Sequence, residues 1–276
     1  MFIVYHLKDI DLKKLWLNEM GWANFAPESR LKCDRAEEEF WRVNAPHYFY
    51  TNNLYKRFPE LGVCVLSLLQ KEDEVLEIGS GSGNFTIPMA ANVQNVLGVE
   101  PSFSMLKSCR QRLEQENVKN VSLIQSKWEE FYSDKLWDVV VSVNSLYRIK
   151  DIVVALNKIN HYAKRRCIIV RSIIRLPVYE VYLKCGISYN ECKDYILIPN
   201  ILWAEGINAN VKYISVKSHK EFGCIEEVWG KNTSRLTAEE KEKLAKAFIQ
   251  AAKIKDGKYI YDFTAVFAVI WWDKRM

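Results

Sequence analysis

Short apolar runs alternate with helical stretches through the middle of the chain. From Glu74 onward, runs rich in Val, Ile and Leu are separated by segments with helical spacing of apolar residues. Strands that are apolar throughout are typical of a parallel sheet buried on both faces, with helices covering those faces. The pattern therefore predicts an α/β fold wound by right-handed crossovers. The runs expected to form its strands are EVLEI, NVLGVE, VSLIQ, WDVVVSV and RCIIVRS.

The two ends of the chain have different patterns. Residues 1–70 are predicted to be a helical cap rich in aromatic side chains, with a break at Pro46, because proline interrupts the hydrogen bonds of a helix interior. Near the other end, residues 211–217 alternate between apolar and polar positions, as a strand with one wet face does. Residues 259–271 predict a long buried strand.

These patterns indicate one α/β core over residues 71–276 behind the cap over residues 1–70. Residues 174–210 are predicted to be a helical insertion on the substrate side of that core. The sequence contains no internal repeat and no low-complexity segment. The cap and the insertion are both rich in aromatic residues, so we expect them to build an enclosed, mostly apolar pocket.

Composition and charge exclude several classes of protein. Apolar residues make up 49% and charged residues 26% of the 276 residues, as in soluble globular proteins. No apolar run reaches the about 18 residues of a membrane-spanning helix, and the first residues are charged too early for a secretory signal. We therefore expect a cytoplasmic protein without a membrane partner. A homodimer is compatible with the sequence.

The net charge of +5 is small and spread along the chain, which argues against a nucleic-acid partner. The densest basic cluster, Lys164-Arg165-Arg166, is predicted to be a solvated helix end. The seven cysteines form no C-x-x-C pair, and the four histidines do not stand at zinc-ligand spacing from them. We predict reduced thiols, mostly in the core, and no metal site.

The segment EVLEIGSGSGNF carries the candidate chemistry. Its apolar run leads directly into Gly79, Gly81 and Gly83. In an open α/β sheet, ligands bind beyond the carboxyl ends of the strands. Glycines allow a turn with positive φ there and let a ligand touch the backbone. The next helix is expected to begin near Gly83 or Asn84, so that its free N–H groups face the turn.

Several readings of this turn compete. A phosphate-binding P-loop needs Lys and then Ser or Thr after its last glycine, where this chain has Asn84 and Phe85. The dinucleotide spacing G-x-G-x-x-G is also missed, and Glu77 would repel a pyrophosphate. Neither Ser80 nor Ser82 has the glycine spacing of a nucleophile elbow. An NAD-dependent enzyme and a bare turn without ligand stay open as alternatives.

The stretch VLEIGSGSG resembles motif I of the class I S-adenosylmethionine-dependent methyltransferases, which is acid-x-Gly-x-Gly-x-Gly after the first strand. The resemblance implies a doubly wound, Rossmann-like sheet of seven strands, of which the last two, residues 211–217 and 259–271, form an antiparallel hairpin. It implies S-adenosylmethionine as cofactor and S-adenosylhomocysteine as product. Glu77 would hold the cofactor's ammonium group. The residues implied to pack against its amino-acid part and ribose are Gly79, Ser80, Gly81 and Gly83.

Glu100 is the second candidate acid. It ends the run NVLGVE, 17 residues after Gly83. An acid at this place in Rossmann-type sites accepts hydrogen bonds from the ribose hydroxyls, and the resemblance implies the same role here. Pro101 starts the following turn and is included in the predicted cofactor site. The alternative for Glu100 is an acid that stabilises a helix N-terminus.

The chain departs from the family pattern after the third strand. Many members carry an Asp there that binds the adenine amine, and this chain has Lys127. We expect the backbone N–H of Trp128 to contact adenine and its ring to cap it, with Ser126 or Glu129 as alternatives.

After the fourth strand, Asn144 and Tyr147 take the places that line the reactive methyl group, and Asn144 is also a candidate cofactor contact. The pattern N-P-P-Y of amino-methylating enzymes matches only at its ends, because the prolines are absent. Asn144 is alternatively a turn or cap residue, and Tyr147 is alternatively a packed phenol of the core.

Trp41, Ala45 and Tyr48 fit the pattern W-x-x-x-A-x-x-Y, which precedes motif I in small-molecule members. The resemblance implies that Tyr48 reaches the cofactor's carboxylate from a lid, with Tyr50 as the fallback.

Together these features predict in-line transfer of a methyl group to a small organic molecule. RNA or protein methylation, and a non-catalytic domain of the same fold, stay as rival functions. Nominal bases for a hydroxyl acceptor are His47, His161, Tyr147 and Glu180.

Overall fold

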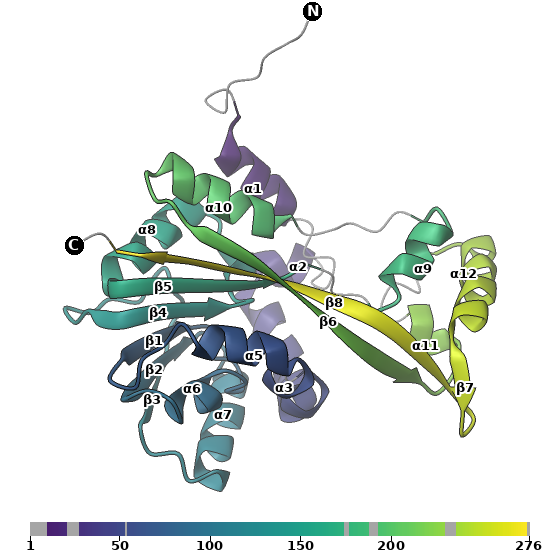
Figure 1. Cartoon of the computed structure of the whole chain (residues 1–276), viewed down its shortest axis with the longest axis horizontal. Coiled ribbons are helices and arrows are strands. Elements are labelled where there is room, and N and C mark those ends of the chain that lie inside the picture. Colours follow the sequence, from purple (N-terminus) through teal and green to yellow (C-terminus); the bar gives the residue numbers. More distant parts are fainter. Residues whose placement is uncertain are drawn as a thin grey trace, which may run out of the picture. The chain divides into compact units, whose positions relative to one another are not determined.

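The computed structural model describes residues 10–20, 28–52, 54–173, 177–187, 193–229 and 236–274. Within them, the strands join into one sheet of the order β3-β2-β1-β4-β5-β8-β6, and β7 pairs with β8 (Figure 1). The strands are β1 (Glu74–Ile78), β2 (Asn95–Glu100), β3 (Val121–Gln125), β4 (Trp137–Val143), β5 (Ala163–Ser172), β6 (Asn210–Phe222), β7 (Lys253–Lys255) and β8 (Lys258–Asp273).

The first five strands are parallel. Their order reverses between β1 and β4, which is the place where doubly wound sheets bind ligands. Val75, Leu76 and Val140 are completely or almost completely buried, as expected of central strands covered on both faces. The predicted α/β fold is thus confirmed, and the strands predicted over residues 211–217 and 259–271 extend over the longer β6 and β8. The strand predicted to be buried, β8, is buried mainly in its second half.

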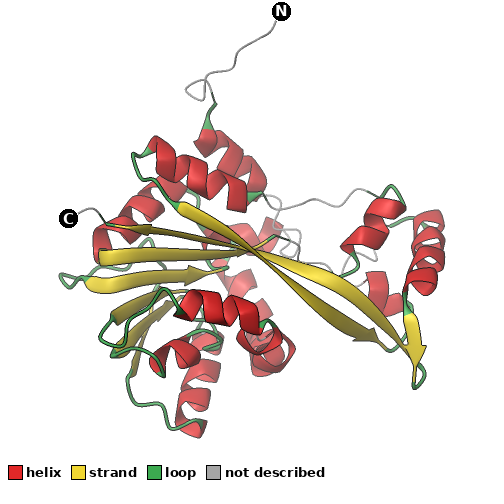
Figure 2. Cartoon of the chain, in the orientation of Figure 1, coloured by secondary structure: helices red, strands yellow, loops and turns green. Residues whose placement is uncertain are grey.

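Helices surround the parallel strands (Figure 2). α7 contacts β2 and β3, and α8 contacts β4. The helices are α1 (Leu12–Met20), α2 (Glu28–Lys32), α3 (Asp34–Asn52), α4 (Leu54–Arg57), α5 (Pro59–Leu66), α6 (Thr86–Ala90), α7 (Phe103–Gln115), the short 3-10 helix η2 (Leu146–Arg148), α8 (Ile152–Tyr162), α9 (Tyr179–Lys184), α10 (Asp194–Ala204), α11 (Glu226–Trp229) and α12 (Ala238–Ala251).

The chain divides into two compact units. The first comprises residues up to 171 together with 192–212 and 268–276, and the second comprises 172–191 and 213–267. The helices of the predicted cap therefore belong to the same unit as the parallel strands. The predicted insertion is divided, because α10 packs on α1 and α8 in the first unit whereas α9 lies in the second.

The second unit has a hydrophobic core of its own. The core is built by α9, α11 and α12 together with the β6 and β8 segments of this unit, and Leu244 and Phe248 are completely buried in it. Tyr182, one of the aromatic residues of the predicted insertion, belongs to this core and is 2% exposed. The side chain of Tyr182 is thus a packing residue.

The expected break at Pro46 is wrong, because α3 continues from Asp34 to Asn52. Proline removes one hydrogen bond from the helix, but tertiary contacts hold the helix around it. Ala45 is 1% exposed, and its carbonyl oxygen accepts a hydrogen bond from Ser108 Oγ of α7 at 3.3 Å. Packing on α7 therefore overrides the local preference.

The described cysteines are free thiols, and three of them, Cys109, Cys167 and Cys185, are buried. Cys33 and Cys224 are exposed, and Cys192 lies outside the described residues. Core packing therefore accounts for only some of the thiols.

Candidate functional site

The glycine turn leaves β1 at the edge where the strand order reverses. The backbone N–H of Gly79 donates to Val99 O of the neighbouring β2 at 2.7 Å. Gly79 has φ +73° and Gly81 has φ +54°, a region that side chains disfavour. The expectation that the helix starts near Gly83 or Asn84 is wrong, because residues 81–85 form turns and α6 starts at Thr86.

Glu77 is buried at the end of β1, with 2% of the residue exposed. The hydroxyl of Thr86 donates to its Oε2 at 2.5 Å. Burial raises the pKa of Glu77 to about 8, and the charge of Glu100 acts in the same direction. The site thus holds a carboxyl group that gains from the approach of a cation.

Glu100 joins the glycine turn to the next βα junction. Its Oε2 accepts from the backbone N–H of Gly81 at 3.0 Å, and its Oε1 accepts from the N–H of Ser102 at 2.9 Å. Burial raises the pKa of Glu100 to about 7, against the effect of these two bonds, and the charges of Glu38 and Glu37 raise it further. The glycine turn and Glu100, both predicted from the sequence to form the cofactor site, are therefore in direct contact.

The glycine turn leaves open space over Gly81 and buries two hydroxyl groups. A Cβ built on Gly81 would find its nearest neighbour, Met105 Cε, 4.0 Å away, so the space above this residue is open. The hydroxyl oxygens of Ser80 and Ser82 are buried, and neither has a hydrogen-bond partner among the residues that the structure describes. The open space lets a ligand touch the backbone at Gly81.

The residues after β3 offer fewer contacts for adenine than the sequence predicted. The Trp128 ring is 3% exposed, stacks with Phe131 at 5.7 Å, and donates to Ala155 O at 3.3 Å. The ring therefore lies in the core, and only the backbone N–H of Trp128 stays a candidate adenine contact. The Lys127 ammonium pairs with Asp34 Oδ2 of α3 at 2.5 Å.

The segment after β4 is fixed to the glycine turn by Ser145. The Ser145 hydroxyl donates to Ile78 O at 2.6 Å, and it shares a 2.7 Å hydrogen bond with the hydroxyl of Ser142. Asn144 has φ +53°, which is uncommon outside glycine and is tolerated by Asn. Sequence reasoning placed Asn144 here but missed Ser145, which no local motif marks.

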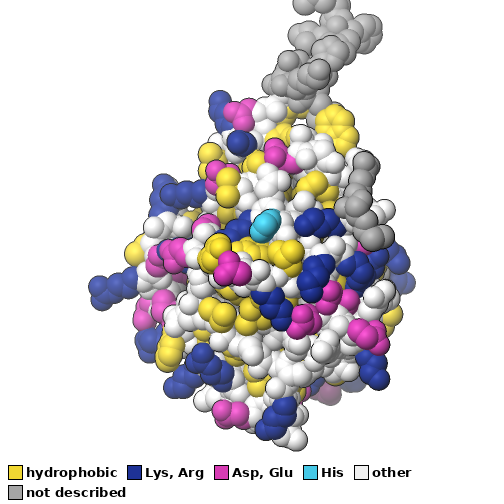
Figure 3. Space-filling view, turned by 90° about the vertical axis from the view of Figure 1, so that its left-hand side faces the viewer, with side chains coloured by type: hydrophobic (Ala, Val, Ile, Leu, Met, Phe, Trp, Pro, Cys, Tyr) yellow, Lys and Arg dark blue, Asp and Glu magenta, His cyan; other side chains and the backbone are white. Residues whose placement is uncertain are grey.

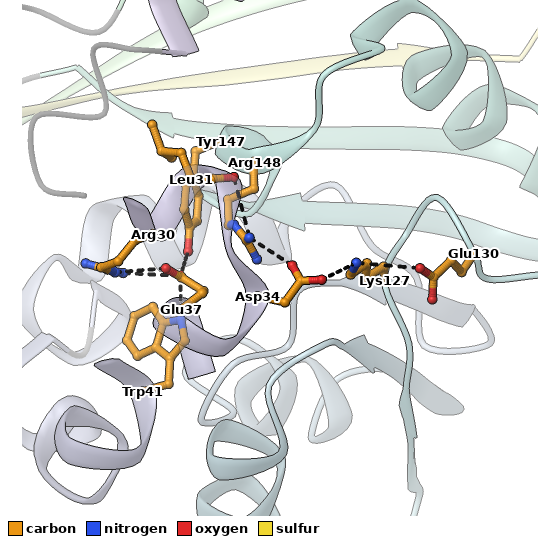
Figure 4. A network of polar contacts seen from close by, with 9 residues as sticks. All are labelled: Arg30, Leu31, Asp34, Glu37, Trp41, Lys127, Glu130, Tyr147 and Arg148. Carbon is orange, nitrogen blue, oxygen red and sulfur yellow. Dashed lines mark hydrogen bonds and ion pairs between the residues drawn. The ribbon is translucent and has the colours of Figure 1, made fainter. Parts of the chain in front are cut away.

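The first two turns of α3 carry three carboxylates that bond to three different loops. Asp34 pairs with Lys127 after β3 and with Arg148 after β4, at 2.5 and 2.9 Å. Glu38 Oε1 accepts from Ser104 Oγ, at the start of α7, at 2.7 Å. Glu37 binds Tyr147 of η2, as Figure 4 shows. These loops all follow carboxyl ends of strands, so α3 is anchored around the site.

Other predicted residues lie near or outside this region. The Trp41 and Tyr48 rings make an edge contact at 5.1 Å on α3, which leaves the proposed role of Tyr48 as a prediction. The side chain of Tyr50 lies outside the described part of the chain. Pro101 follows Glu100 directly and is exposed.

Among the nominal bases, His161 lies at the wrong edge of the sheet. It belongs to the last turn of α8, directly before the start of β5, and its carbonyl oxygen accepts from Lys274 Nζ at 3.3 Å. The glycine turn lies at the opposite, carboxyl edge. Arg112 was not predicted from the sequence. Its buried guanidinium donates to Ser82 O at 2.6 Å and so holds the glycine turn in place.

A family model described as a methyltransferase domain matches residues 69–248. Among curated proteins, the 23S rRNA (uracil(1939)-C(5))-methyltransferase RlmD of Aliivibrio fischeri is 29% identical over 111 residues, which cover 37% of this chain and 25% of that protein. The enzyme of the same name from Francisella tularensis subsp. novicida is 24% identical over 137 residues, 50% of this chain and 27% of that protein. The chain therefore spans about a quarter of the length of these relatives.

Solved structures share the fold. Protein BH2331 of Bacillus halodurans C-125 matches with a TM-score of 0.52 and 16% identity, over 79% of this chain and 98% of that one. DhpI, solved as a complex with SAH, matches with a TM-score of 0.51 and 14% identity, over 87% and 97%. At such identities the likeness concerns the fold alone. It agrees with the strand order described above.

Proposed function

The chain belongs to the methyltransferase-domain family, and on this premise we propose that it is an S-adenosylmethionine-dependent methyltransferase that methylates a small organic molecule by in-line transfer. The observation that carries the proposal is the bond between Gly81 N–H and the Glu100 carboxylate, beneath open space. The ribose and amino-acid part of the cofactor fit this place.

We assign the cofactor contacts as follows. Glu100 accepts from the ribose hydroxyls, and Glu77 faces the amino-acid end. The remaining assigned contacts are Gly79, Gly81, Gly83, Pro101, Asn144, Tyr48 and the backbone of Lys127 and Trp128.

The charge of the site supports this assignment. Glu37, Glu38 and Glu77 lie close enough to Glu100 for their charges to act on it or to feel its charge. Carboxylates in a partly desolvated site attract a cation strongly. S-adenosylmethionine carries a sulfonium and an ammonium group, and so it suits an acidic surrounding better than a pyrophosphate would.

When bound, the cofactor supplies an electrophilic methyl group, so the protein has mainly to align the acceptor with it. Tyr147 and Asn144 are our candidates for lining that methyl group. The Tyr147 hydroxyl donates to Glu37, and burial raises the pKa of Tyr147. Tyr147 is therefore held as a neutral phenol, which suits it to positioning an acceptor and not to removing a proton.

Surface charge supports a small acceptor over RNA. Figure 3 shows basic and acidic side chains interspersed over one face. The cluster expected at a helix end lies instead at the start of β5, where Lys164, Arg165 and Arg166 pair with Asp138, Asp73 and Asp273, respectively, at 3.3, 2.6 and 2.6 Å. These basic groups are paired with acids, and they lie at the edge of the sheet opposite the glycine turn.

RNA methylation is the second candidate, because the curated relatives are named as rRNA methyltransferases. The match covers only about a quarter of their length. In the part of the chain that the structure describes, no helix has the length and apolar character needed to cross a membrane. Small metabolites and RNA are the two acceptor classes to test.

Two measurements test the proposal. Calorimetric titration is expected to show S-adenosylmethionine binding that Glu100→Ala weakens by about 10–100-fold, since a hydrogen bond to a charged group contributes about 1.5–3 kcal/mol. The matched control is Glu72→Ala, an exposed acid before β1. Transfer of tritiated methyl groups into a metabolite extract, with ribosomal RNA in a parallel reaction, then identifies the acceptor class. Label in RNA alone would refute the small-molecule proposal.

A further inference from the structure

Glu37 is the most heavily bonded carboxylate of the described site. Its Oε1 accepts from Tyr147 Oη at 2.5 Å, from Trp41 Nε1 at 2.8 Å and from Arg30 Nη2 at 3.2 Å. Its Oε2 accepts from Arg30 Nε at 2.8 Å. The residue is 5% exposed. One side chain thus joins α2, α3 and η2 (Figure 4).

This arrangement is built to be rigid. Arg30 is 8% exposed, and its guanidinium lies 3.2 Å from the centroid of the Phe40 ring. A buried ion pair of this kind contributes little net stability, and its best-attested use is to select one arrangement of the parts that it joins. On the same helix, Glu39 pairs with Arg42 at 2.7 Å, but both side chains are more than half exposed. That pair offers a matched surface control.

A series of contacts links Glu37 to the glycine turn. Tyr147 is separated by a single residue from Ser145, which donates to Ile78 O and packs directly on Gly79. The segment 144–148 is therefore tied to the glycine turn at its start and to α3 near its end.

We propose that Glu37 is a positioning residue for the cofactor site: through Tyr147 and Ser145 it couples the docking of α3 to the shape of the glycine turn. The proposal rests on the proposed function. It requires that loss of the Glu37–Tyr147 bond loosens a turn that neither residue contacts directly.

The first test uses the whole chain without ligand. Hydrogen exchange of the backbone amides of residues 79–85 is compared among wild type, Glu37→Gln, Tyr147→Phe and the control Glu39→Gln. We expect Glu37→Gln and Tyr147→Phe to exchange these amides faster than the wild type does. Glu39→Gln should exchange them at the wild-type rate. Tyr147→Phe removes only one hydroxyl, so it keeps the test valid where Glu37→Gln destabilises the fold.

The second test measures the affinity for S-adenosylhomocysteine by calorimetry. Each of the two variants is expected to bind about tenfold more weakly, and the double variant no more weakly than either single one, because both break the same link. Ser108→Ala, which removes another bond between α3 and α7, is the stability control and should leave the affinity within about twofold.

Unchanged exchange at residues 79–85, or losses of affinity that multiply in the double variant, would overturn the proposal. Wild-type protein that fails to bind S-adenosylhomocysteine would instead contradict the proposed function, while the exchange experiment would still decide the coupling.

Discussion

Ser145 stands so close to Gly79 that a β-carbon on the glycine would lie 2.2 Å from the β-carbon of Ser145. Gly79 follows β1 and Ser145 follows β4, and the two strands are neighbours in the sheet. The glycine is thus required by its partner as well as by its φ of +73°. The glycine turn therefore packs tightly against the residues that follow β4. This packing limits the space in which a ligand can lie.

Gly79→Ala is therefore expected to destabilise the protein by more than backbone strain alone. A residue with a side chain in this region of φ costs about 1–2 kcal/mol, and the clash with Ser145 adds to it. Urea unfolding measures the sum. Gly206→Ala is the matched control, because Gly206 has φ +80° and nothing within 4 Å of its added Cβ. Equal losses in the two variants would show that the contact with Ser145 costs nothing.

Gly81→Ala separates ligand binding from stability. The added Cβ meets no atom closer than 4.0 Å, so the loss of stability should match that of Gly206→Ala. The same Cβ occupies the space assigned to the cofactor, and we expect affinity for S-adenosylmethionine to fall by more than about tenfold, which corresponds to about 1.4 kcal/mol. Calorimetric titration of the folded variant measures this. Binding at wild-type strength would place the cofactor elsewhere.

Stability should fall as pH rises, because of Glu77. Its pKa is about 8 in the folded protein against the ordinary value of 4.5, mainly through burial. Its contribution is fully present below pH 4.5 and is lost as pH rises through about 8, with a slope of at most about 1.4 kcal/mol per pH unit. Urea unfolding of the ligand-free protein at pH 5 to 8 measures the slope.

Glu77→Gln should reduce that slope, since its side chain keeps a carbonyl oxygen for the Thr86 hydroxyl but cannot ionise. The part of the slope that remains below about pH 7 is expected from Glu100, whose pKa burial raises to about 7. The exposed Glu72→Gln should leave the slope as it is. A slope in Glu77→Gln as steep as that of the wild type between pH 7 and 8 would show that Glu77 does not cause it.

Much of the first unit follows from local pattern. Runs such as EVLEI and NVLGVE indicate buried parallel strands, and the glycines and Glu100 then fall at carboxyl ends of neighbouring strands. The sequence alone therefore predicts that Glu77, Gly81 and Glu100 lie in one site. Gly81 and Glu100 are joined by a hydrogen bond from the backbone N–H of Gly81 to the Glu100 carboxylate. This bond follows from the same topology.

Contacts between distant segments could not be predicted in the same way. Glu37 and Tyr147 are 110 positions apart, and nothing in either local sequence marks the other. The ring of Trp128 is predicted to cap the adenine because it follows Lys127, which takes the place of the family's Asp, yet the ring completes the core with Phe131 and Tyr162. Side-chain direction at a loop depends on packing partners, which periodicity does not encode.

Cofactor binding should release protons. Glu100 has a pKa of about 7 and Glu77 of about 8 in the ligand-free protein, so both carry protons for part of the time at neutral pH. A cation nearby favours the ionised carboxylate. The binding enthalpy of S-adenosylmethionine at pH 7 should therefore depend on the ionisation enthalpy of the buffer, and titrations in phosphate and in Tris measure the number of protons released. Glu77→Gln should reduce it, and equal enthalpies in both buffers for wild type would mean that neither carboxyl ionises on binding.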